Sequence, residues 1–219
     1  MSLQERAVIT RNAIIRGAAE VFAEHSYAQA SLSDIVARAN VTKGALYFHF
    51  KSKEELASAV IDEQHKAVLE GAVIVAAMGR SALDTLVLLS VDFCRQLLDD
   101  VVVRAGIRLT LEGVEVGRDL RALYSDWVAS TEGIIDRGIA DGILRPVLPA
   151  ADLARYMVGA FTGVQLVSEM LAERSDLLER VEHLWSLLVP AMVAPHLVEE
   201  ASSVPAKLFA EFGVAGIRD

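Results

Sequence analysis

The stretch SLSDIVARANVTKGALYFHFKSK, residues 31–53, decides the fold of the first part of the chain. Ser31 followed by Asp34 is typical of a capping box, so we expect a helix to begin there. Thr42 can cap a second short helix, Lys43 to about Phe50, because its hydroxyl can accept from an N–H of the first helical turn. Two short helices joined by a tight turn predict a helix-turn-helix, an arrangement that can place one helix in the major groove of DNA.

The second of these helices divides into an outward and an inward face. Leu46 and Phe50 are one turn apart and are expected to point inward, and we also assign Phe48 to the core. Lys43 lies in the first turn, where such a helix meets base edges and phosphates. Tyr47 can reach a phosphate through its hydroxyl. The alternatives are a solvated lysine and a half-buried aromatic residue.

Other residues of this stretch are expected to support the same contact. Gly44 and Ala45 have small side chains or none, so the backbone can approach DNA closely. Thr42 and Ser33 can cap helices and touch phosphate at once. The full predicted set, completed by two residues that can reach phosphate, is Ser33, Thr42, Lys43, Gly44, Ala45, Tyr47, His49 and Lys53.

The distribution of charge favours this interpretation over an ordinary helical hairpin with a few surface charges. Residues 1–53 contain seven Lys/Arg and four Asp/Glu, which gives +3. The whole chain has a formal net charge of −9, so the remainder carries −12. A basic end on an acidic body favours docking on DNA through that end alone, because the body is repelled.

The composition predicts more apolar surface than one soluble subunit needs. Apolar residues make up 53% of the chain, and the mean hydropathy is +0.37. No stretch reaches the roughly 18–20 apolar residues of a membrane helix, and the first residues do not resemble a signal peptide. We therefore expect a subunit interface, an internal cavity, or both. Cys94, the single cysteine, is interpreted as a packing residue of a cytoplasmic protein.

Apolar periodicity predicts helices and no strand along the rest of the chain, so the expected fold class is all-α. One helix, Arg6 to about His25, precedes the helix-turn-helix. The expected later helices are Ser52 to about Met78, Ser81 to about Leu98, a cap at Asp99 or Asp100 through Leu111, Arg118 to Asp141, Ala150 to Glu173, Ser175 to about Val193, and Pro205 to Phe212. A change of composition near Lys53 divides the chain into a DNA-binding domain, 1–53, and a larger domain, 54–219.

The motif VTKGALYFHFKSKEEL, Val41 to Leu56, resembles the TetR (tetracycline-repressor) family of transcriptional regulators. A narrower resemblance, to the γ-butyrolactone receptors of that family, comes from Val103 to Gly106, from Trp127 within a helix, and from Ala160 to Gln165. In those receptors a small lactone hormone releases a repressor from genes of antibiotic production and morphological development. Some close relatives bind the antibiotics or furan-type signals instead.

This resemblance implies that residues 54–219 bind a ligand. The indole N–H of Trp127 can donate to a lactone carbonyl, and Thr131 lies one turn further on. Thr162 and Gln165 add polar groups to an otherwise apolar helix, which is typical of a cavity with a few polar anchors. The predicted ligand set is therefore Trp127, Thr131, Thr162 and Gln165. The alternatives are core packing for Trp127 and an interhelical hydrogen bond for Gln165.

The resemblance also implies that the last two long helices pair with a second subunit in a four-helix bundle. Gly159 and Gly163 are four residues apart and allow close approach of helices. The α-helical stripe expected at the interface is Leu184, Trp185, Leu188 and Met192. An internal core is the alternative for this stripe.

Three classes of function compete. The leading hypothesis is a transcriptional repressor, in which a homodimer binds a pseudo-palindromic double-stranded DNA operator and a small apolar, γ-butyrolactone-like ligand releases it. An enzyme is disfavoured, because no catalytic arrangement, cofactor motif or metal-ligand spacing is visible; no catalytic residue, cofactor or metal is predicted. An architectural DNA-binding protein without a ligand is disfavoured by the acidic body, which would not coat DNA broadly.

Overall fold

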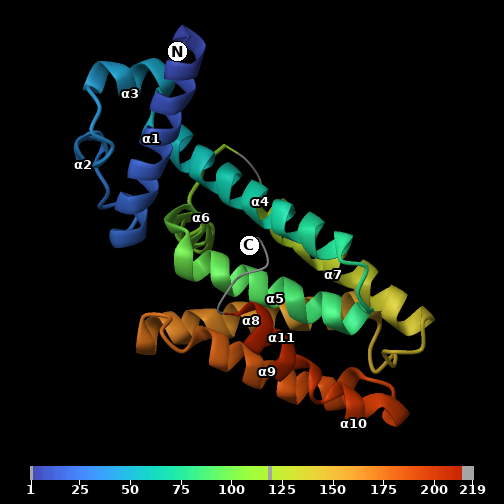
Figure 1. Ribbon diagram of the computed structural model, residues 1–219. Coiled ribbons are helices and arrows are strands. Elements are labelled where there is room, and N and C mark those ends of the chain that lie inside the picture. The colour runs from blue at the N-terminus through green and yellow to red at the C-terminus, as the bar shows by residue number, and fades with distance from the viewer. Residues whose placement is uncertain (1, 118–119, 214–219) are drawn as a thin grey trace. The chain divides into compact units, whose positions relative to one another are not determined.

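The structure is a computed structural model that describes residues 2–117 and 120–213 (Figure 1). The helices are α1 (Leu3–Glu24), α2 (Leu32–Arg38), α3 (Lys43–His49), α4 (Lys53–Ala77), α5 (Ala82–Asp99), α6 (Val101–Leu111), α7 (Leu120–Ala140), α8 (Ala150–Ala172), α9 (Leu177–Met192), η1 (Pro195–Leu197), α10 (Val198–Ala201) and α11 (Val204–Phe212). An isolated bridge between Leu144 and Val193 is the only β-pairing in these residues, so the all-α prediction is confirmed. None of the helices within the described ranges is long and apolar enough to cross a membrane.

The helix-turn-helix forms where the sequence predicts it, and local hydrogen bonds explain its geometry. The Asp34 N–H donates to the Ser31 hydroxyl over 3.1 Å at the start of α2. The Ala45 N–H donates to the Thr42 hydroxyl over 3.1 Å at the start of α3. Between the two helices Asn40 has a φ of 52°, in the left-handed region that asparagine tolerates better than most residues. Side-chain chemistry therefore specifies the turn.

The later helices lie within a few residues of their predicted limits. Asp100 caps α6 by accepting from the Val102 N–H over 2.8 Å. The predicted start of α7 at Arg118 lies outside the described residues. The sequence did not indicate η1 and α10, because three or four residues of helix carry too little periodicity to be recognised.

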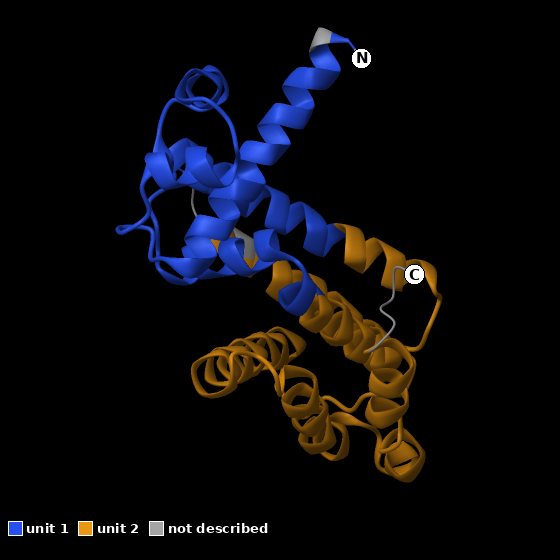
Figure 2. Cartoon of the chain, turned by 60° about the vertical axis from the view of Figure 1, so that its left-hand side comes forward, with its two compact units in different colours: residues 1–69, 96–120 blue, residues 70–95, 121–219 orange. Residues whose placement is uncertain are grey.

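The chain divides into two compact units, which Figure 2 colours separately. Unit 1 comprises residues 1–69 and 96–120, and unit 2 comprises residues 70–95 and 121–219. Unit 1 therefore extends beyond the predicted boundary at Lys53, because α6 packs on α1. A compact unit need not coincide with a functional domain. The assignment of DNA binding to residues 1–53 therefore remains a prediction.

Helix α1 is the central support of unit 1. Its residues Ile14, Ala18 and Phe22 repeat every four positions and are fully buried. Helices α2, α3 and α6 all pack against α1. Helix α2 ends so close to it that a Cβ at Gly17 would lie 2.8 Å from the Cβ of Ala39. Only glycine fits at this crossing.

In unit 2, α8 and α9 pack together and α11 packs on α9. The assignment of the α9 stripe to a subunit interface is wrong for Trp185 and Met192, which are only 3% and 1% exposed. The indole N–H of Trp185 donates to the Ser90 hydroxyl oxygen of α5 over 2.7 Å. A helical repeat shows that one face is buried but does not show whether the same chain or a partner buries it.

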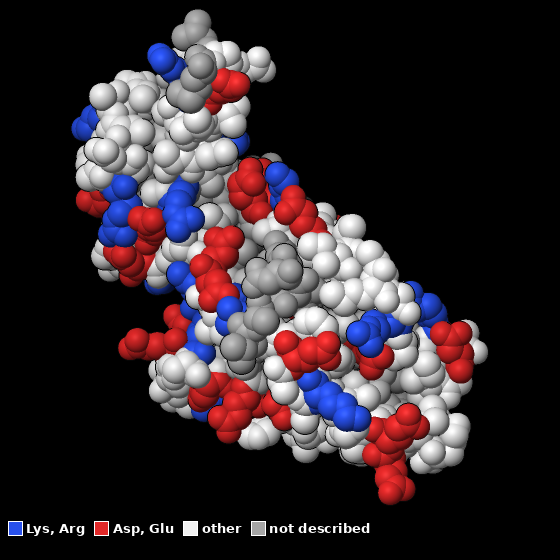
Figure 3. All heavy atoms as spheres, viewed as in Figure 1, with Lys and Arg blue, Asp and Glu red and all other residues white. Residues whose placement is uncertain are grey.

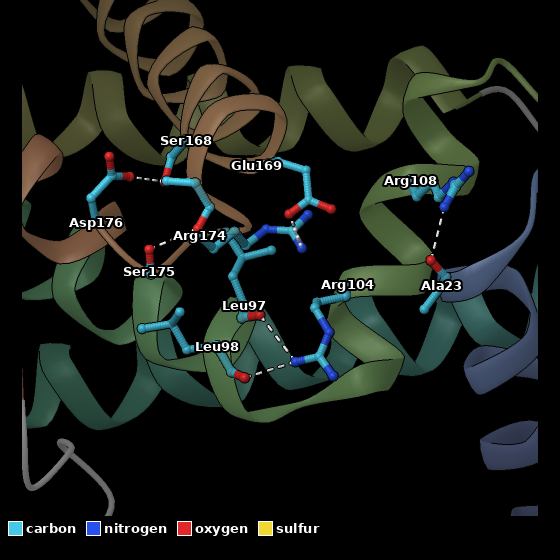
Figure 4. A network of polar contacts seen from close by, with 11 residues as sticks. Ala23, Leu97, Leu98, Arg104, Arg108, Ser168, Glu169, Arg174, Ser175 and Asp176 are labelled. Carbon is cyan, nitrogen blue, oxygen red and sulfur yellow. Dashed lines mark hydrogen bonds and ion pairs between the residues drawn. The ribbon is translucent and has the colours of Figure 1, made fainter.

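A polar network holds the connection between α8 and α9 (Figure 4). The Ser168 hydroxyl donates to Asp176 over 2.6 Å, and Arg174 pairs with Glu169 over 2.7 Å. Two successive residues of this connection, Glu173 and Arg174, have left-handed backbones with φ of 49° and 64°. Because that conformation is unfavourable for residues with a Cβ, the surrounding contacts must maintain it.

One buried side chain of unit 1 is poorly satisfied. Gln64 of α4 is fully buried, and neither end of its amide has a hydrogen-bond partner among the described residues. Helix α6 meets it at Gly106, where a Cβ would overlap the Gln64 side chain. An unpaired buried amide costs about 1–3 kcal/mol, so this contact between α4 and α6 is less stable than its close packing suggests.

Replacement of Gln64 by Met is expected to raise the free energy of unfolding by about 1–2 kcal/mol, because methionine has a similar length and removes the unpaired amide. Denaturant titration of both proteins measures the difference. Gln64→Glu serves as the control, since it keeps the shape but buries a charge, and it should lower stability. Equal stabilities of the wild type and the Met variant would show that the amide is satisfied in solution.

Candidate functional site

Most of the predicted DNA-contacting residues are exposed on the helix-turn-helix of unit 1. The exposed ones are Ser33, Thr42, Lys43, Gly44 and Tyr47, and the half-buried ones are Ala45 and His49. The Thr42 hydroxyl accepts from the α3 backbone, which leaves its O–H able to donate to a phosphate. Capping and phosphate contact are therefore compatible at this residue.

The assignment of Phe48 to the core is wrong. Its side chain is 81% exposed, and its ring lies edge-on to His49 with the centroids 5.0 Å apart. Leu46 and Phe50 are the residues that fill the inward side, and both are buried. Residues 46 and 48 differ by about 200° around a helix axis, so α3 cannot bury both.

Lys53 is hydrogen-bonded to the backbone of unit 1, whereas the sequence analysis expected it to contact a phosphate. Its ammonium donates to the backbone oxygens of Tyr27 over 2.8 Å and Ala30 over 3.0 Å. It also lies 4.4 Å from the centre of the Tyr27 ring. Two of its three N–H donors are thus used within unit 1, where they tie the start of α4 to the loop between α1 and α2.

Other charged residues of the amino-terminal part are also engaged within the protein. Arg38 donates two hydrogen bonds of 2.8 Å to the Glu24 carboxylate, which lowers the pKa of Glu24 and raises the pKa of Arg38. The guanidinium of Arg11 lies 5.3 Å from the centre of the Phe50 ring. On the face drawn in Figure 3, basic and acidic side chains are interspersed, so the positive charge forms no single patch there.

Unit 2 contains an aromatic cluster around Trp127. Tyr124 lies edge-on to Trp127 with the ring centroids 4.9 Å apart, and Phe93 lies 6.2 Å from Trp127. Phe93 also contacts Phe161, with the centroids 5.5 Å apart. Gln165 is buried one turn beyond Phe161 on α8. The sequence analysis indicated Trp127 but not its aromatic neighbours, because Phe93 and Phe161 come from two other helices.

The two threonines of the predicted ligand set use their hydroxyl protons within their own helices. The Thr131 O–H donates to the Trp127 backbone oxygen over 2.9 Å, and the Thr162 O–H donates to the Val158 oxygen over 2.8 Å. Burial raises the pKa of Tyr124. In contrast, the buried indole N–H of Trp127 has no partner among the described residues.

Neither metal binding nor thiol chemistry is suggested elsewhere. Among the residues that the structure describes, no group of His, Cys, Asp and Glu side chains could hold a metal ion. Cys94 is buried, and burial raises the pKa of its thiol. A thiol that stays protonated is a poor nucleophile, so packing is the role that suits Cys94.

A helix-turn-helix with an exposed second helix, in a chain that is otherwise helical, defines a DNA-binding regulator. Residues 14–60 match the family described as bacterial regulatory proteins, tetR family. Residues 80–194 match the tetracyclin repressor-like, C-terminal domain. The chain belongs to the TetR family of transcriptional regulators.

Individual relatives indicate which members of the TetR family this chain resembles. The A-factor receptor protein of Streptomyces griseus is 38% identical over 201 residues, which cover 90% of this chain and 69% of that protein. The crystal structure of an ArpA-like γ-butyrolactone receptor has a TM-score of 0.80 at 29% identity and covers 94% of this chain and 99% of its own. CprB from Streptomyces coelicolor, in complex with its biological operator sequence, has a TM-score of 0.76 at 27% identity and covers 91% and 97%. The prediction of a TetR-type regulator rather than an enzyme is confirmed.

Lys43 and Lys53 are expected to differ in their effect on stability. Lys53→Ala removes two charge-assisted hydrogen bonds and should cost about 1–3 kcal/mol. Lys43 is exposed at the start of α3, so Lys43→Ala should leave the melting temperature unchanged. Thermal melts followed by circular dichroism measure both. A Lys53→Ala protein that melts like the wild type would contradict the structural role of this lysine.

Proposed function

We propose that this regulator is a ligand-released repressor, in which a homodimer binds a pseudo-palindromic operator until a small γ-butyrolactone-like molecule releases it. The observation that carries the ligand assignment is the buried, unpartnered indole N–H of Trp127 among aromatic rings. An unpaired buried donor is costly, and a lactone carbonyl is an acceptor that would satisfy it. The relatives named as A-factor and γ-butyrolactone receptors support the same ligand class.

DNA is read by α3 in this proposal. Lys43 contacts a base edge or a phosphate, Tyr47 contacts a phosphate, and the small residues Gly44 and Ala45 let the backbone come close. The exposed ring of Phe48 adds an apolar group to this surface. Such a group suits the C5-methyl of a thymine in the major groove. The regulator acts on its operator in the cytoplasm and needs no cofactor.

The homodimer is proposed to form through an exposed apolar surface of unit 2, here called the α8–α9 face. Its large side chains are Tyr156, Val167, Met170, Leu171 and Leu187. Met170 is 82% exposed, and apolar surface of this kind usually marks an interaction site. Gly159 and Gly163 lie on the same side of α8, and a Cβ at either would meet no atom within 4 Å. The space above these glycines is therefore available to a helix of the partner.

Gly163→Leu is expected to turn the dimer into a monomer without damaging the subunit. The new side chain meets open space within the chain and raises helix propensity by roughly 0.5–1 kcal/mol, but it would hold two subunits apart. Sedimentation should give twice 23.7 kDa for the wild type and 23.7 kDa for the variant. Gly133→Leu in α7, which also meets open space, is the control and should stay dimeric. A dimeric Gly163→Leu protein would contradict this interface.

Ligand binding in unit 2 would act on DNA binding by linkage. If the ligand weakens operator affinity by some factor, the operator must weaken ligand affinity by the same factor. The aromatic cluster would hold an aliphatic tail at ~0.8 kcal/mol per buried methylene, while Trp127 orients the polar head. An antibiotic or another apolar molecule is the alternative ligand, and the same aromatic rings would stack on it.

Two variants of Trp127 test the ligand site. A duplex is selected by the wild type from a random-sequence library, and its release by synthetic γ-butyrolactones with different aliphatic chains is followed by gel shift. Trp127→Phe keeps an aromatic ring but lacks the N–H, so it should bind the duplex normally and need about tenfold more lactone for release. Trp127→Ala should bind the duplex and not be released.

A thermal melt of each variant separates this role from core packing. If Trp127 were only a core residue, its truncation would cost about 3–5 kcal/mol and would weaken DNA binding as well. Folded variants that are released like the wild type would exclude a ligand contact at Trp127. Release of the wild type by antibiotics but by no lactone would identify the alternative ligand class.

A further inference from the structure

The loop between α1 and α2 is bound from α6 by a pair of charged residues, all within unit 1. Arg108 donates to the Ala23 backbone oxygen over 2.8 Å, at the carboxy end of α1 (Figure 4). Arg108 also donates to Glu112 over 2.9 Å. The other oxygen of the Glu112 carboxylate accepts from the Tyr27 backbone N–H over 2.9 Å. One ion pair thus holds the last turn of α1 and the loop that follows it.

The same loop is bound from α4 by Lys53. The Lys53 ammonium takes the Tyr27 backbone oxygen, so both backbone groups of Tyr27 are held, one by α6 and one by α4. Lys53 is the first residue of α4 and lies three positions after Phe50, which caps α3. Tyr27 therefore connects α6 with the short segment that carries the recognition helix into α4.

We propose that Arg108 and Glu112 are positioning residues for operator binding, because they fix α3 through Tyr27 and Lys53. This inference rests on the proposed DNA contact of α3. Neither Arg108 nor Glu112 was indicated by the sequence pattern, and neither needs to touch DNA for this role.

The energetics favour a positioning role over a simple stabilising one. The side chains of Arg108 and Glu112 are 39% and 29% exposed, and an exposed i,i+4 pair contributes little to stability. Their hydrogen bonds instead satisfy the Ala23 oxygen, in the last turn of α1, and the Tyr27 N–H of the loop that follows.

Arg104 provides a matched control on the same helix. Its guanidinium donates to the backbone oxygens of Leu97 and Leu98 over 3.2 and 2.8 Å, not to α1 (Figure 4). Arg104→Ala therefore removes an arginine of α6 that donates two hydrogen bonds, as Arg108 does, and leaves the Arg108–Glu112 pair intact. Tyr27→Phe is a second control, because it keeps both backbone groups through which the link runs.

The experiment measures affinity for the selected duplex and for a random duplex, each over a range of salt concentrations. Arg108→Ala should bind the selected duplex about tenfold more weakly and the random duplex normally. The slope of log affinity against log salt should not change, because no phosphate contact is lost. Arg104→Ala and Tyr27→Phe should bind both duplexes like the wild type. Arg108→Lys, which keeps the charge and can reach one carbonyl, should recover part of the loss.

Hydrogen exchange on the DNA-free protein makes the test independent of the proposed function. Arg108→Ala should speed exchange of the α2 and α3 amides, whereas Arg104→Ala should not. If the wild type selects no duplex from the library but the exchange pattern is as expected, the repressor proposal is overturned, while the link from Arg108 and Glu112 to α3 stands. Equal effects of Arg108→Ala and Arg104→Ala on duplex affinity and exchange would overturn the positioning role.

Discussion

Helices α1 and α2 cross so closely that the chain has no room for a side chain at Gly17. A Cβ there would come within 2.8 Å of the backbone nitrogen of Ala39 as well as its Cβ. Glycine weakens a helix by roughly 0.5–1 kcal/mol relative to alanine, a cost that the fully buried Ile14, Ala18 and Phe22 offset on the same helix. The position of α2 follows from this crossing, and the turn at Asn40 then sets where α3 projects.

Helix α1 packs against α6 as well as against α2 and α3, and this explains why the predicted DNA-binding part cannot be separated cleanly from the rest. Helix α6 lies far along the chain from α1, yet the two pack together in one unit. The loop after α1 is held by Lys53 from α4 and by the Arg108–Glu112 pair from α6. A boundary drawn from composition at residue 53 divides the chain by charge, but packing includes α6 with the amino-terminal helices.

Features that depend on neighbouring residues could be predicted from the sequence, whereas those that depend on distant ones could not. The caps at Ser31 and Thr42 act over three residues, so their spacing was sufficient to place α2 and α3. Lys53 looked like a phosphate ligand because its carbonyl partners lie more than twenty residues away in the loop after α1. Trp185 looked like an interface residue because its partner, Ser90, belongs to another helix. In the ligand site, one large aromatic residue was visible in the pattern, but its neighbours become recognisable only when three helices pack together.

The chain has two tryptophans, and the structure gives them opposite hydrogen-bonding states. The indole of Trp185 is buried and donates to Ser90, while the indole of Trp127 has no acceptor among the described residues. An indole that gains a hydrogen bond emits at longer wavelength, and one whose bond is unchanged keeps its spectrum. Intrinsic fluorescence therefore contains a built-in reporter and a built-in reference: a molecule that pairs with Trp127 would shift one component of the emission and leave the other in place.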